Sequence, residues 1–262
     1  MNNNLLVIGI IPARMASSRF PGKPLAEIQS IPMVGHVYFR SKMSQMLDEV
    51  YIATCDNEIV QYAERIGAKV VSTMNTHERA SDRTAEAMIK IEREINKKVD
   101  IVVMIQGDEP MLIPEMVDKA IEPLVNDTKI LVSNLMASPQ NRDEHEDPNE
   151  IKVVVDNDSY ALYFSREPIP SRRGDAGDVP MYKQVCIIPF RREFLIKFNE
   201  LSHTPLEKAE SIDMLRVLEH GYKVKMVFTK HETYSVDTVD DLRRVEYLIK
   251  NDPLVDKYRQ EK

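Results

Sequence analysis

The feature that most constrains this chain is an apolar run, residues 5–11, that leads directly into a polar and cationic loop. An uninterrupted apolar run bounded by turn residues is typical of a strand buried on both faces of a parallel sheet. The loop, residues 10–25, reads IIPARMASSRFPGKPL and contributes Arg14, Ser17, Ser18, Arg19, Gly22 and Lys23. Because open α/β sheets bind ligands at the carboxyl ends of their strands, the segment is either a site for a polyanion such as a triphosphate or a solvated basic loop.

The loop differs from both common phosphate-binding motifs. Gly22 and Lys23 are adjacent, but Ser17 stands where the Walker motif needs glycine, and Pro24 stands where it needs serine or threonine. No G-x-G-x-x-G pattern follows the first strand. The sequence therefore disfavours a P-loop kinase and a Rossmann dehydrogenase.

Segments of strand and helix character alternate along the first half of the chain, which predicts an α/β fold with a mainly parallel sheet and helices on both faces. The expected strands are residues 50–54, 69–72, 101–105 and 130–136, and the expected helices are residues 32–47, 82–95 and 114–124. A further helix is expected between Asp56, which would cap it, and Gly67, which would end it.

The pattern changes after residue 137. We expect an exposed loop (138–150), a hairpin (152–155 and 160–165), a loop (166–183), a strand (184–188), a helix (206–220), a strand (223–229), a last helix (238–250) and a tail that frays. This gives three predicted parts: a core of residues 1–137, an added lobe of residues 138–222, and a return to the core over residues 223–262.

Composition limits the classes of partner. The 262 residues carry a formal net charge of -7, which argues against nucleic acid as a partner. The two cysteines, Cys55 and Cys186, are far apart without metal-binding spacing, as is typical of a reduced protein. Since no signal peptide, lipidation motif or membrane-spanning run is found, we expect a cytoplasmic protein that does not act at a membrane.

Two carboxylates follow strand-like segments. Asp108 lies in QGDEP directly after residues 101–105, where it would either hold a divalent cation or cap the next helix. Asp237 precedes the last helix, where metal binding and helix capping are both open. Two carboxylates, phosphate oxygens and water make an ordinary magnesium shell, because this ion seldom uses an all-protein cage.

Other candidates are less specific. The segment HERASDR, residues 77–83, would read a base, bind a phosphate or cap a helix. Arg166 would clamp a substrate carboxylate or lie on the surface. Glu207, Glu210 and Asp213 are spaced as on a solvated helix face. No serine, histidine and aspartate arrangement suggests hydrolysis through a nucleophile.

Five segments then carry a resemblance to a known family: IIPARMASSRFPGKPL, VMIQGDEP, YALYFSREPIP, TPLEKAESIDMLRVLEHG and VDTVDDL. Together, over roughly residues 6–250, the chain resembles the 3-deoxy-manno-octulosonate (KDO) cytidylyltransferases, or CMP-KDO synthetases. The resemblance implies a nucleotide-diphospho-sugar transferase-like fold, a homodimer and a requirement for Mg²⁺. It also implies transfer of CMP from CTP to the anomeric hydroxyl of a small acidic sugar, with release of pyrophosphate, for surface polysaccharide biosynthesis.

The resemblance also implies roles for individual residues. Arg14, Lys23 and Asp108 would be catalytic, and Asp108 and Asp237 would bind the metal. The nucleotide would contact Ala13, Arg14, Ser18, Arg19, Lys23, Ala80, Ser81, Arg83 and Gln106. The acceptor would contact Gln106, Arg166, Gln184, Glu210, Asp213 and Met214. By the same resemblance, residues 1–137 would bind CTP and residues 138–222 would bind the acceptor and form the dimer.

Three segments depart from the family pattern. Arg79 and Ala80 replace the serine and glycine of H-x-S-G-T-[DE]-R, Gln184 replaces the histidine of H-L-G-I-Y, and Asp213 with Met214 replaces the acid and amide of L-E-Q-L-R. The donor half therefore follows the pattern and the acceptor half departs from it, and such changes can shift substrate discrimination strongly.

Three functions remain open at this point. The first is a cytidylyltransferase for KDO or a closely related sugar acid. The second is a cytidylyltransferase for another acceptor, such as 8-amino-KDO, another nonulosonic acid, or a phosphorylated or phosphonate small molecule. The third is a non-catalytic nucleotide-binding regulator, against which the retained carboxylates and cations argue.

Overall fold

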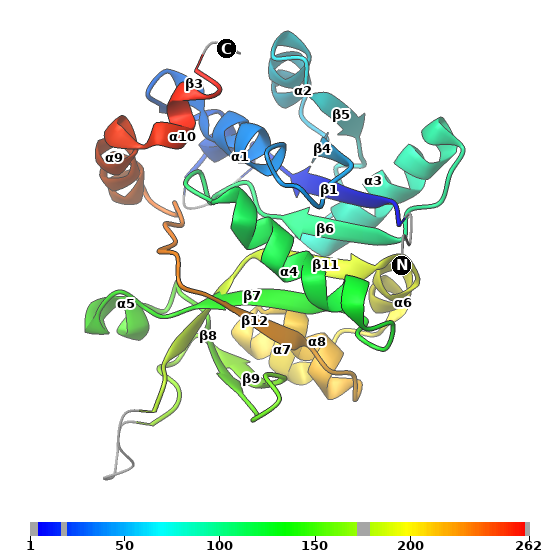
Figure 1. The fold of residues 1–262 in the computed structure, drawn as a ribbon, viewed down its shortest axis with the longest axis vertical. Coiled ribbons are helices and arrows are strands. Elements are labelled where there is room, and N and C mark those ends of the chain that lie inside the picture. Colours follow the sequence, from blue (N-terminus) through cyan, green and yellow to red (C-terminus); the bar gives the residue numbers. More distant parts are fainter. Residues whose placement is uncertain (1–4, 17–19, 172–178, 260–262) are drawn as a thin grey trace. The chain divides into compact units, whose positions relative to one another are not determined.

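The apolar run at the start of the chain forms β1 (Val7–Pro12), with parallel partners on both sides (Figure 1). One partner is β4 (Glu49–Thr54), beyond which lies β5 (Lys69–Ser72), and the other is β6 (Ile101–Ile105). All five residues of β6 and five of the six in β1 are buried, as expected for central strands of a parallel sheet. The α/β fold with a parallel sheet is therefore confirmed.

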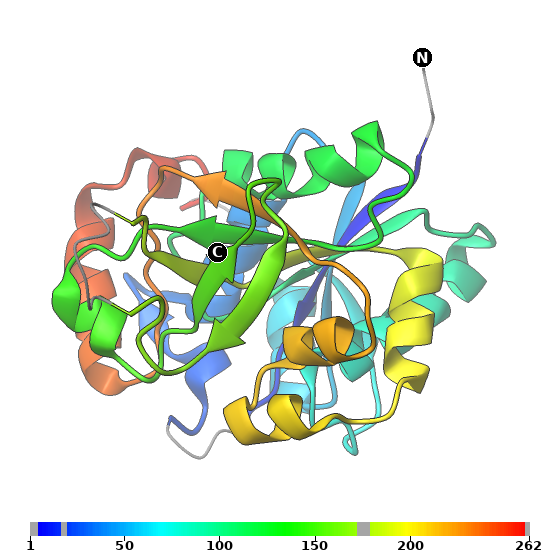
Figure 2. The same ribbon diagram turned by 90° about the horizontal axis from the view of Figure 1, so that it is seen from below.

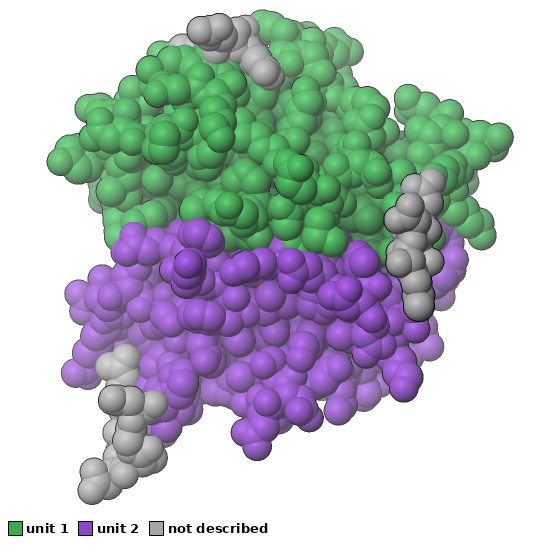
Figure 3. All heavy atoms as spheres, viewed as in Figure 1, with its two compact units in different colours: residues 1–118, 233–262 green, residues 119–232 purple. Residues whose placement is uncertain are grey.

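The computed structural model describes residues 5–16, 20–171 and 179–259, so the predicted nucleotide contacts Ser18 and Arg19 lie outside the described residues. The chain divides into two compact units, coloured in Figure 3. The first unit is residues 1–118 and 233–262, and the second is residues 119–232. Among the described residues, no helix has the length and apolar character needed to cross a membrane.

The first unit contains several helices, most of which pack on its strands. They are α1 (Met33–Ser41), α2 (Asn57–Arg65), α3 (Ala80–Ile95), α9 (Val239–Leu248) and α10 (Pro253–Asp256), with the short helices η1 (Lys23–Leu25) and η2 (Ile249–Asn251). The short strands β2 (Glu27–Ile28) and β3 (Ile31–Pro32) pair before α1. α1 ends at Ser41, six residues earlier than predicted, and the chain then turns through hydrogen bonds to the Asp118 carboxylate.

The second unit contains a mixed sheet in the order β12-β7-β10-β8-β9, in which β12 and β7 are parallel and the other pairs antiparallel (Figure 2). The strands are β7 (Ser133–Ala137), β8 (Lys152–Val155), β9 (Ala161–Ser165), β10 (Tyr182–Val185) and β12 (Lys225–Thr229). The predicted hairpin is confirmed as β8 and β9. The helix α4 (Pro114–Asn126) runs from the first unit into the second.

Several sequence predictions for the second unit were wrong. The predicted helix 206–220 is two helices, α7 (Pro205–Glu210) and α8 (Asp213–Glu219), because Ser211 adopts a left-handed conformation with φ of 55°. The predicted strand 184–188 is divided between β10 and β11 (Ile187–Arg191). The helix α6 (Arg192–Glu200) was missed, and the predicted loop 138–150 contains α5 (Arg142–Glu146) with a buried His145.

The predicted solvated face of residues 207–213 was also wrong. Glu207 is fully buried and accepts hydrogen bonds from Arg216, which is 1% exposed. Burial alone would raise the pKa of the Glu207 carboxyl, but the Arg216 guanidinium and His203 outweigh this and lower it. Glu207 and Arg216 are nine residues apart on two helices, and spacing alone cannot distinguish such a buried ion pair from a solvated face.

The described part of the C-terminal tail, residues 252–259, is ordered rather than frayed. Val255 and Tyr258 are each 1% exposed, and the Tyr258 hydroxyl lies in a buried cluster that we call the His36 cluster, consisting of His36, Arg40, Asp252 and Tyr258. His36 Nε2 is 2.8 Å from the Ile28 carbonyl, so Nε2 carries the proton and Nδ1 accepts from the Tyr258 hydroxyl at 2.8 Å. The Tyr258 oxygen in turn accepts from Arg40 Nε at 3.0 Å.

The His36 cluster makes stability depend on pH. Burial first, and then Arg40, lower the pKa of His36 from 6.5 to about 4, so the folded protein keeps this imidazole neutral. The unfolded chain binds a proton below about pH 6.5 that the folded chain does not bind. The contribution of the neutral His36 to the free energy of unfolding is complete above about pH 6.5. It is lost as the pH falls towards 4, by up to about 3 kcal/mol.

We therefore expect the free energy of unfolding in urea to fall between pH 7.5 and pH 5, and His36→Gln to remove part of this dependence. His220→Gln, at a histidine that bonds the Ser202 carbonyl in an exposed position, is the control and should keep the wild-type dependence. Identical pH dependence in wild type and His36→Gln would contradict the assignment.

Candidate active site

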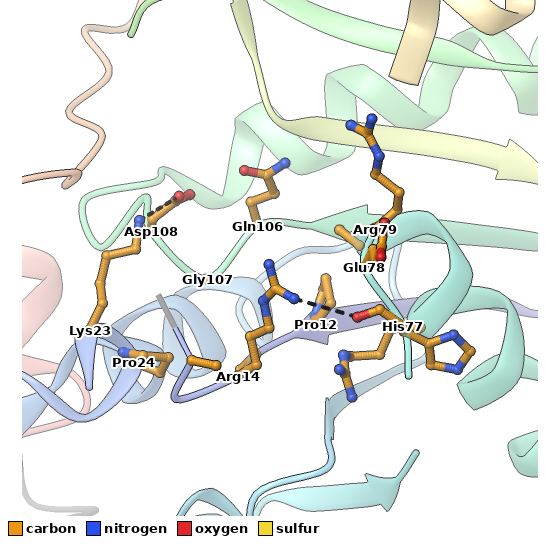
Figure 4. Close-up of a pocket in the computed structure, with 14 residues that line it drawn as sticks. Pro12, Arg14, Lys23, Pro24, His77, Glu78, Arg79, Gln106, Gly107 and Asp108 are labelled. Carbon is orange, nitrogen blue, oxygen red and sulfur yellow. Dashed lines mark hydrogen bonds and ion pairs between the residues drawn. The ribbon is translucent and has the colours of Figure 1, made fainter. Parts of the chain in front are cut away.

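Three segments bring a lysine and two carboxylates together at the carboxyl edge of the parallel sheet. Lys23 lies in η1 after the loop that follows β1, Asp108 follows β6, and Asp237 precedes α9. Lys23 Nζ is 3.0 Å from Asp108 Oδ2 and 3.2 Å from Asp237 Oδ1, and it donates to the Val236 carbonyl at 2.8 Å. Figure 4 shows the Lys23 and Asp108 side chains directed at one another. The backbone adds a further link, from the Val236 amide to the Asp108 carbonyl at 2.9 Å.

The local electrostatics favour the charged lysine. Burial alone would lower the pKa of the Lys23 ammonium, but the charges of Asp108 and Asp237 outweigh it and raise the pKa above its ordinary value. The three side chains are 16–22% exposed, so a ligand can reach them. The two carboxylates therefore face one cation rather than one another.

Neither the Asp108 nor the Asp237 carboxylate takes the alternative role of capping a helix. Thr238, not Asp237, is the N-cap of α9, and it forms a capping box with Asp241. The Asp108 side chain binds Lys23 instead of an amide of α4. Both carboxylates are thus available to a cation at the sheet edge.

The donor set fits magnesium. Among the described residues there is no group of three or more His, Cys, Asp or Glu that could enclose a metal ion. Magnesium needs no such group, because it takes one or two carboxylates and completes its shell with phosphate oxygens and water. The ammonium of Lys23 marks the point between Asp108 and Asp237 that favours a cation.

A pocket of about 330 Å³ opens beside this arrangement (Figure 4). Its lining includes, from the predicted nucleotide-binding residues, Ala13, Arg14, Lys23, Ala80, Arg83 and Gln106, together with Asp108. Arg14 Nη1 is 3.5 Å from the His77 carbonyl, which leaves the exposed guanidinium beside the pocket. Arg79, which replaces a small family residue, lines the pocket as well. Ser81 is fully buried in the first turn of α3 and is not part of this lining.

Arg83 has an unusual environment for a buried cation. It is 3% exposed, and its Nη1 donates to the Thr73 hydroxyl. Its buried Nη2 has no hydrogen-bond partner among the described residues. A buried N–H without a partner is costly, and the Arg83 side chain lines the pocket, so a ligand acceptor would satisfy it.

Glu86 holds the connection between β5 and α3, which forms part of the pocket wall. Nothing in the sequence marked Glu86 as a site residue. The Glu86 carboxylate accepts from the Met74 amide at 2.9 Å and also contacts His77 and Lys90. Burial would raise the pKa of Glu86, but Lys90, Met74 and His77 together lower it to about 2. The segment of residues 74–77 is therefore fixed onto α3.

Asp56, which was predicted to cap a helix, also holds the base of the cationic loop. Asp56 is the N-cap of α2, but its side chain makes no capping bond. Its Oδ2 accepts instead from the Met15 amide at 2.7 Å, and the Gly22 amide donates to the Met15 carbonyl at 3.1 Å. Gly22 has φ of 75°, a conformation that favours glycine. These bonds fix both ends of the loop.

In the second unit, Arg166 and Glu210 form a separate polar cluster. The Glu210 carboxylate accepts from the Ser165 hydroxyl and the Arg166 amide, both at 2.8 Å. Arg166 Nε donates to the Glu210 carbonyl at 2.8 Å, and Nη1 donates to the Pro148 carbonyl at 2.9 Å. Although burial opposes it, the Arg166 amide and the Ser165 hydroxyl lower the pKa of Glu210. The guanidinium is thus oriented by backbone carbonyls, with Nη2 making no hydrogen bond to a described residue.

The remaining acceptor candidates lie on other elements of the second unit. Gln184 on β10 is 8% exposed, and its Nε2 donates to the Asn134 side chain. Met214 on α8 is 1% exposed, while Asp213 at the start of α8 is partly exposed. The structure thus brings Arg166 and Glu210 into contact, and it gives Gln184 a separate partner.

Two buried lysines of the second unit were not selected from sequence. Lys152 is fully buried, and its Nζ donates to the carbonyls of Asp147, Glu150 and Arg166. Lys183, its neighbour across the strand pair, is 2.6 Å from Glu144. Isolated lysines in strands have no sequence signal that separates them from surface residues, so only the fold identifies them.

Comparison with known proteins now identifies the family, because a family model described as Cytidylyltransferase matches residues 8–259. The chain belongs to the cytidylyltransferase family. A 3-deoxy-manno-octulosonate cytidylyltransferase of Geotalea daltonii is 41% identical over 249 residues, which cover 91% of this chain and 96% of that protein. A mitochondrial protein of the same name from Arabidopsis thaliana is 41% identical over 246 residues, which cover 93% and 83%.

A solved structure gives the same relationship. The structure of CMP:2-keto-3-deoxy-manno-octonic acid synthetase complexed with CTP is 36% identical to this chain, with a TM-score of 0.85. The match covers 93% of this chain and 98% of the chain in that structure. A 4-diphosphocytidyl-2C-methyl-D-erythritol synthase of Anaerococcus prevotii, 13% identical with a TM-score of 0.62, shares the fold alone. This cytidylyltransferase is thus a CTP-dependent nucleotidyltransferase with the nucleotide-diphospho-sugar transferase-like fold.

The bond between Asp56 and Met15 gives a specific prediction. Asp56→Ala removes the acceptor that holds the cationic loop, so we expect CTP binding, measured by calorimetry, to weaken about fivefold, the effect of one lost hydrogen bond. Asp48→Ala is the matched control, because the Asp48 carboxylate accepts the Val7 amide at the opposite end of β1, at 2.8 Å. Equal CTP affinity in the two variants would contradict the role of Asp56.

Proposed function

We propose that this cytidylyltransferase transfers CMP from CTP to the anomeric hydroxyl of KDO or a closely related sugar acid, with release of pyrophosphate. The observation that carries the proposal is the meeting of Lys23, Asp108 and Asp237 beside a pocket lined by further cations. The names of the relatives at about 40% identity support KDO as the acceptor. In the cell, we place this reaction in the cytoplasm.

The reaction is an in-line displacement at the α-phosphorus. A bond forms between the anomeric oxygen and this phosphorus, and the bond from this phosphorus to the bridging oxygen breaks. Pyrophosphate leaves with the bridging oxygen, and the proton of the anomeric hydroxyl passes to water. Catalysis of this kind depends on positioning and on neutralising charge rather than on a covalent intermediate. We assign Lys23 and Arg14 to the phosphate oxygens and the leaving pyrophosphate.

Magnesium would be held by Asp108 and Asp237, where it would supply positive charge to the phosphate oxygens. Lys23 would then leave its position between the two carboxylates and bind the triphosphate. Arg83 Nη2, which has no partner among the described residues, would donate to an acceptor of the bound nucleotide. Ala13, Ala80, Ser81 and Gln106 complete the proposed nucleotide site, with Ser18 and Arg19 from the cationic loop.

The acceptor is proposed to bind through Arg166, whose guanidinium suits a carboxylate. Gln106, Gln184, Glu210, Asp213 and Met214 are the other proposed acceptor residues. Because Gln184, Asp213 and Met214 depart from the family pattern, a second candidate acceptor such as 8-amino-KDO, another nonulosonic acid or a phosphonate deserves the same assay. Pyrophosphate release from CTP with a panel of these acceptors tests both candidates, and no turnover with any acidic sugar would refute the proposal.

Asp108 gives the most direct prediction for this site. Asp108→Asn keeps the shape of the side chain but removes its charge, so we expect kcat to fall about 10²- to 10³-fold, as for the loss of one electrostatic contributor. Asp100→Asn is the control, since Asp100 bonds the Leu6 amide at the other end of β6. Turnover of Asp108→Asn within a few-fold of wild type would remove Asp108 from the metal site.

A homodimer is part of the proposal. Two large apolar side chains on strands of the second unit are exposed, Leu162 on β9 at 61% and Phe228 on β12 at 46%, and the Phe228 ring contacts Tyr182. We propose that these two side chains belong to the dimer contact. Sedimentation of wild type and of Phe228→Ser would test whether this sheet forms the dimer.

A further inference from the structure

The His36 cluster connects the three segments that carry Lys23, Asp108 and Asp237. Its four residues, His36, Arg40, Asp252 and Tyr258, all belong to the first unit. His36, Arg40 and Tyr258 are each 0–1% exposed, so the cluster lies within the core rather than at the pocket. Figure 1 shows α10 beside α1 and β3, and α9 contacts β2.

Each contact of the cluster reaches a different segment of the active site. His36 Nε2 donates at 2.8 Å to the Ile28 carbonyl in β2, which follows the helix that holds Lys23. Arg40 Nη1 donates at 3.3 Å to the Leu112 carbonyl, in the connection between Asp108 and α4. Arg40 Nη2 binds Asp252 at 2.6 Å, in the segment that continues α9 beyond Asp237.

The Tyr258 hydroxyl completes the network. It accepts from Arg40 Nε at 3.0 Å and donates to His36 Nδ1 at 2.8 Å, so each hydrogen bond of the network has one donor and one acceptor. A buried polar network whose members are all satisfied holds its elements in one arrangement, whereas a partly satisfied one does not. Removing this hydroxyl would leave His36 Nδ1 and Arg40 Nε without their partner.

We propose that Tyr258 is a positioning residue for the reaction, which acts through His36 and Arg40 to set the separation of the Asp108 and Asp237 carboxylates. Neither Tyr258 nor its partners touch the pocket, so the effect is transmitted through the backbone of β2, of the Leu112 connection and of α9. The C-terminal segment thereby becomes part of the machinery that holds the metal-binding carboxylates. The kinetic part of this inference rests on the proposed function, but its structural part does not.

The test uses Tyr258→Phe in the full-length protein. This variant keeps the ring that stacks on Phe39, with centroids 5.3 Å apart, and removes only the hydroxyl. The control is Tyr62→Phe, which removes a hydroxyl from another buried ring that packs on α1, at Gly35. Among the described residues the Tyr62 hydroxyl has no hydrogen-bond partner, so this control leaves the three active-site segments as they are. Asp252→Asn is a second, milder variant of the cluster.

The first measurement is amide hydrogen exchange at Val236, whose N–H binds the Asp108 carbonyl at 2.9 Å and so reports directly on the two carboxylate segments. We expect Tyr258→Phe to accelerate exchange at Val236 about fivefold relative to Tyr62→Phe, the effect of one lost hydrogen bond, and Asp252→Asn to act in the same direction. This measurement needs no substrate.

The second measurement is steady-state kinetics with CTP, Mg²⁺ and the acceptor. We expect Tyr258→Phe to lower kcat about fivefold and to raise the Mg²⁺ concentration for half-maximal rate, with the KM of the acceptor unchanged. If Tyr258→Phe lowers the melting temperature but leaves Val236 exchange and kcat as in Tyr62→Phe, the cluster is structural only and the proposal is refuted. If wild type shows no turnover, the proposed function fails, and the exchange result alone still decides the role of Tyr258.

Discussion

One ammonium group between two carboxylates is the interaction on which the rest of the active site depends. Asp108 and Asp237 lie far apart in sequence, but their side chains meet at one point of the site. Their like charges would repel one another there without a cation between them. Lys23 supplies that cation in the free protein, at 3.0 and 3.2 Å from the two carboxylates, and its pKa is raised as a result. Exchange of this ammonium for a metal ion with bound triphosphate is what the proposed reaction requires.

The surrounding structure holds Lys23, Asp108 and Asp237 in place. Asp56 fixes the base of the cationic loop, and the backbones of Asp108 and Val236 are hydrogen-bonded to one another. The His36 cluster links the segments that carry the three residues. In the second unit, Arg166 is oriented by backbone carbonyls and by Glu210 in a comparable way. In both units, hydrogen bonds from backbone groups and from neighbouring carboxylates hold the segments that carry the cations proposed to meet substrate.

The sequence predicts the central strands well, and it predicts buried pairs poorly. β1 and β6 are continuous apolar runs, which are typical of a strand buried on both faces, and Asp108 follows one of them directly. Glu207 was predicted to be solvated because its partner Arg216 comes from a different helix, divided from it at Ser211. The ordered tail was missed for the same reason, since the partners of Tyr258 are more than two hundred residues away. Asp56 is the N-cap of α2 as predicted, but its carboxylate binds the loop after β1, which the sequence did not indicate.

A crystal structure of the protein with CTP and Mg²⁺ would test whether Asp108 and Asp237 hold the metal. We expect one metal ion bound by oxygens of both Asp108 and Asp237 at about 2.1 Å, with phosphate oxygens in the same shell. We also expect Lys23 Nζ to leave the carboxylates and to contact the triphosphate. A complex in which CTP and the metal bind without Asp108 or Asp237, while Lys23 stays between them, would contradict this expectation.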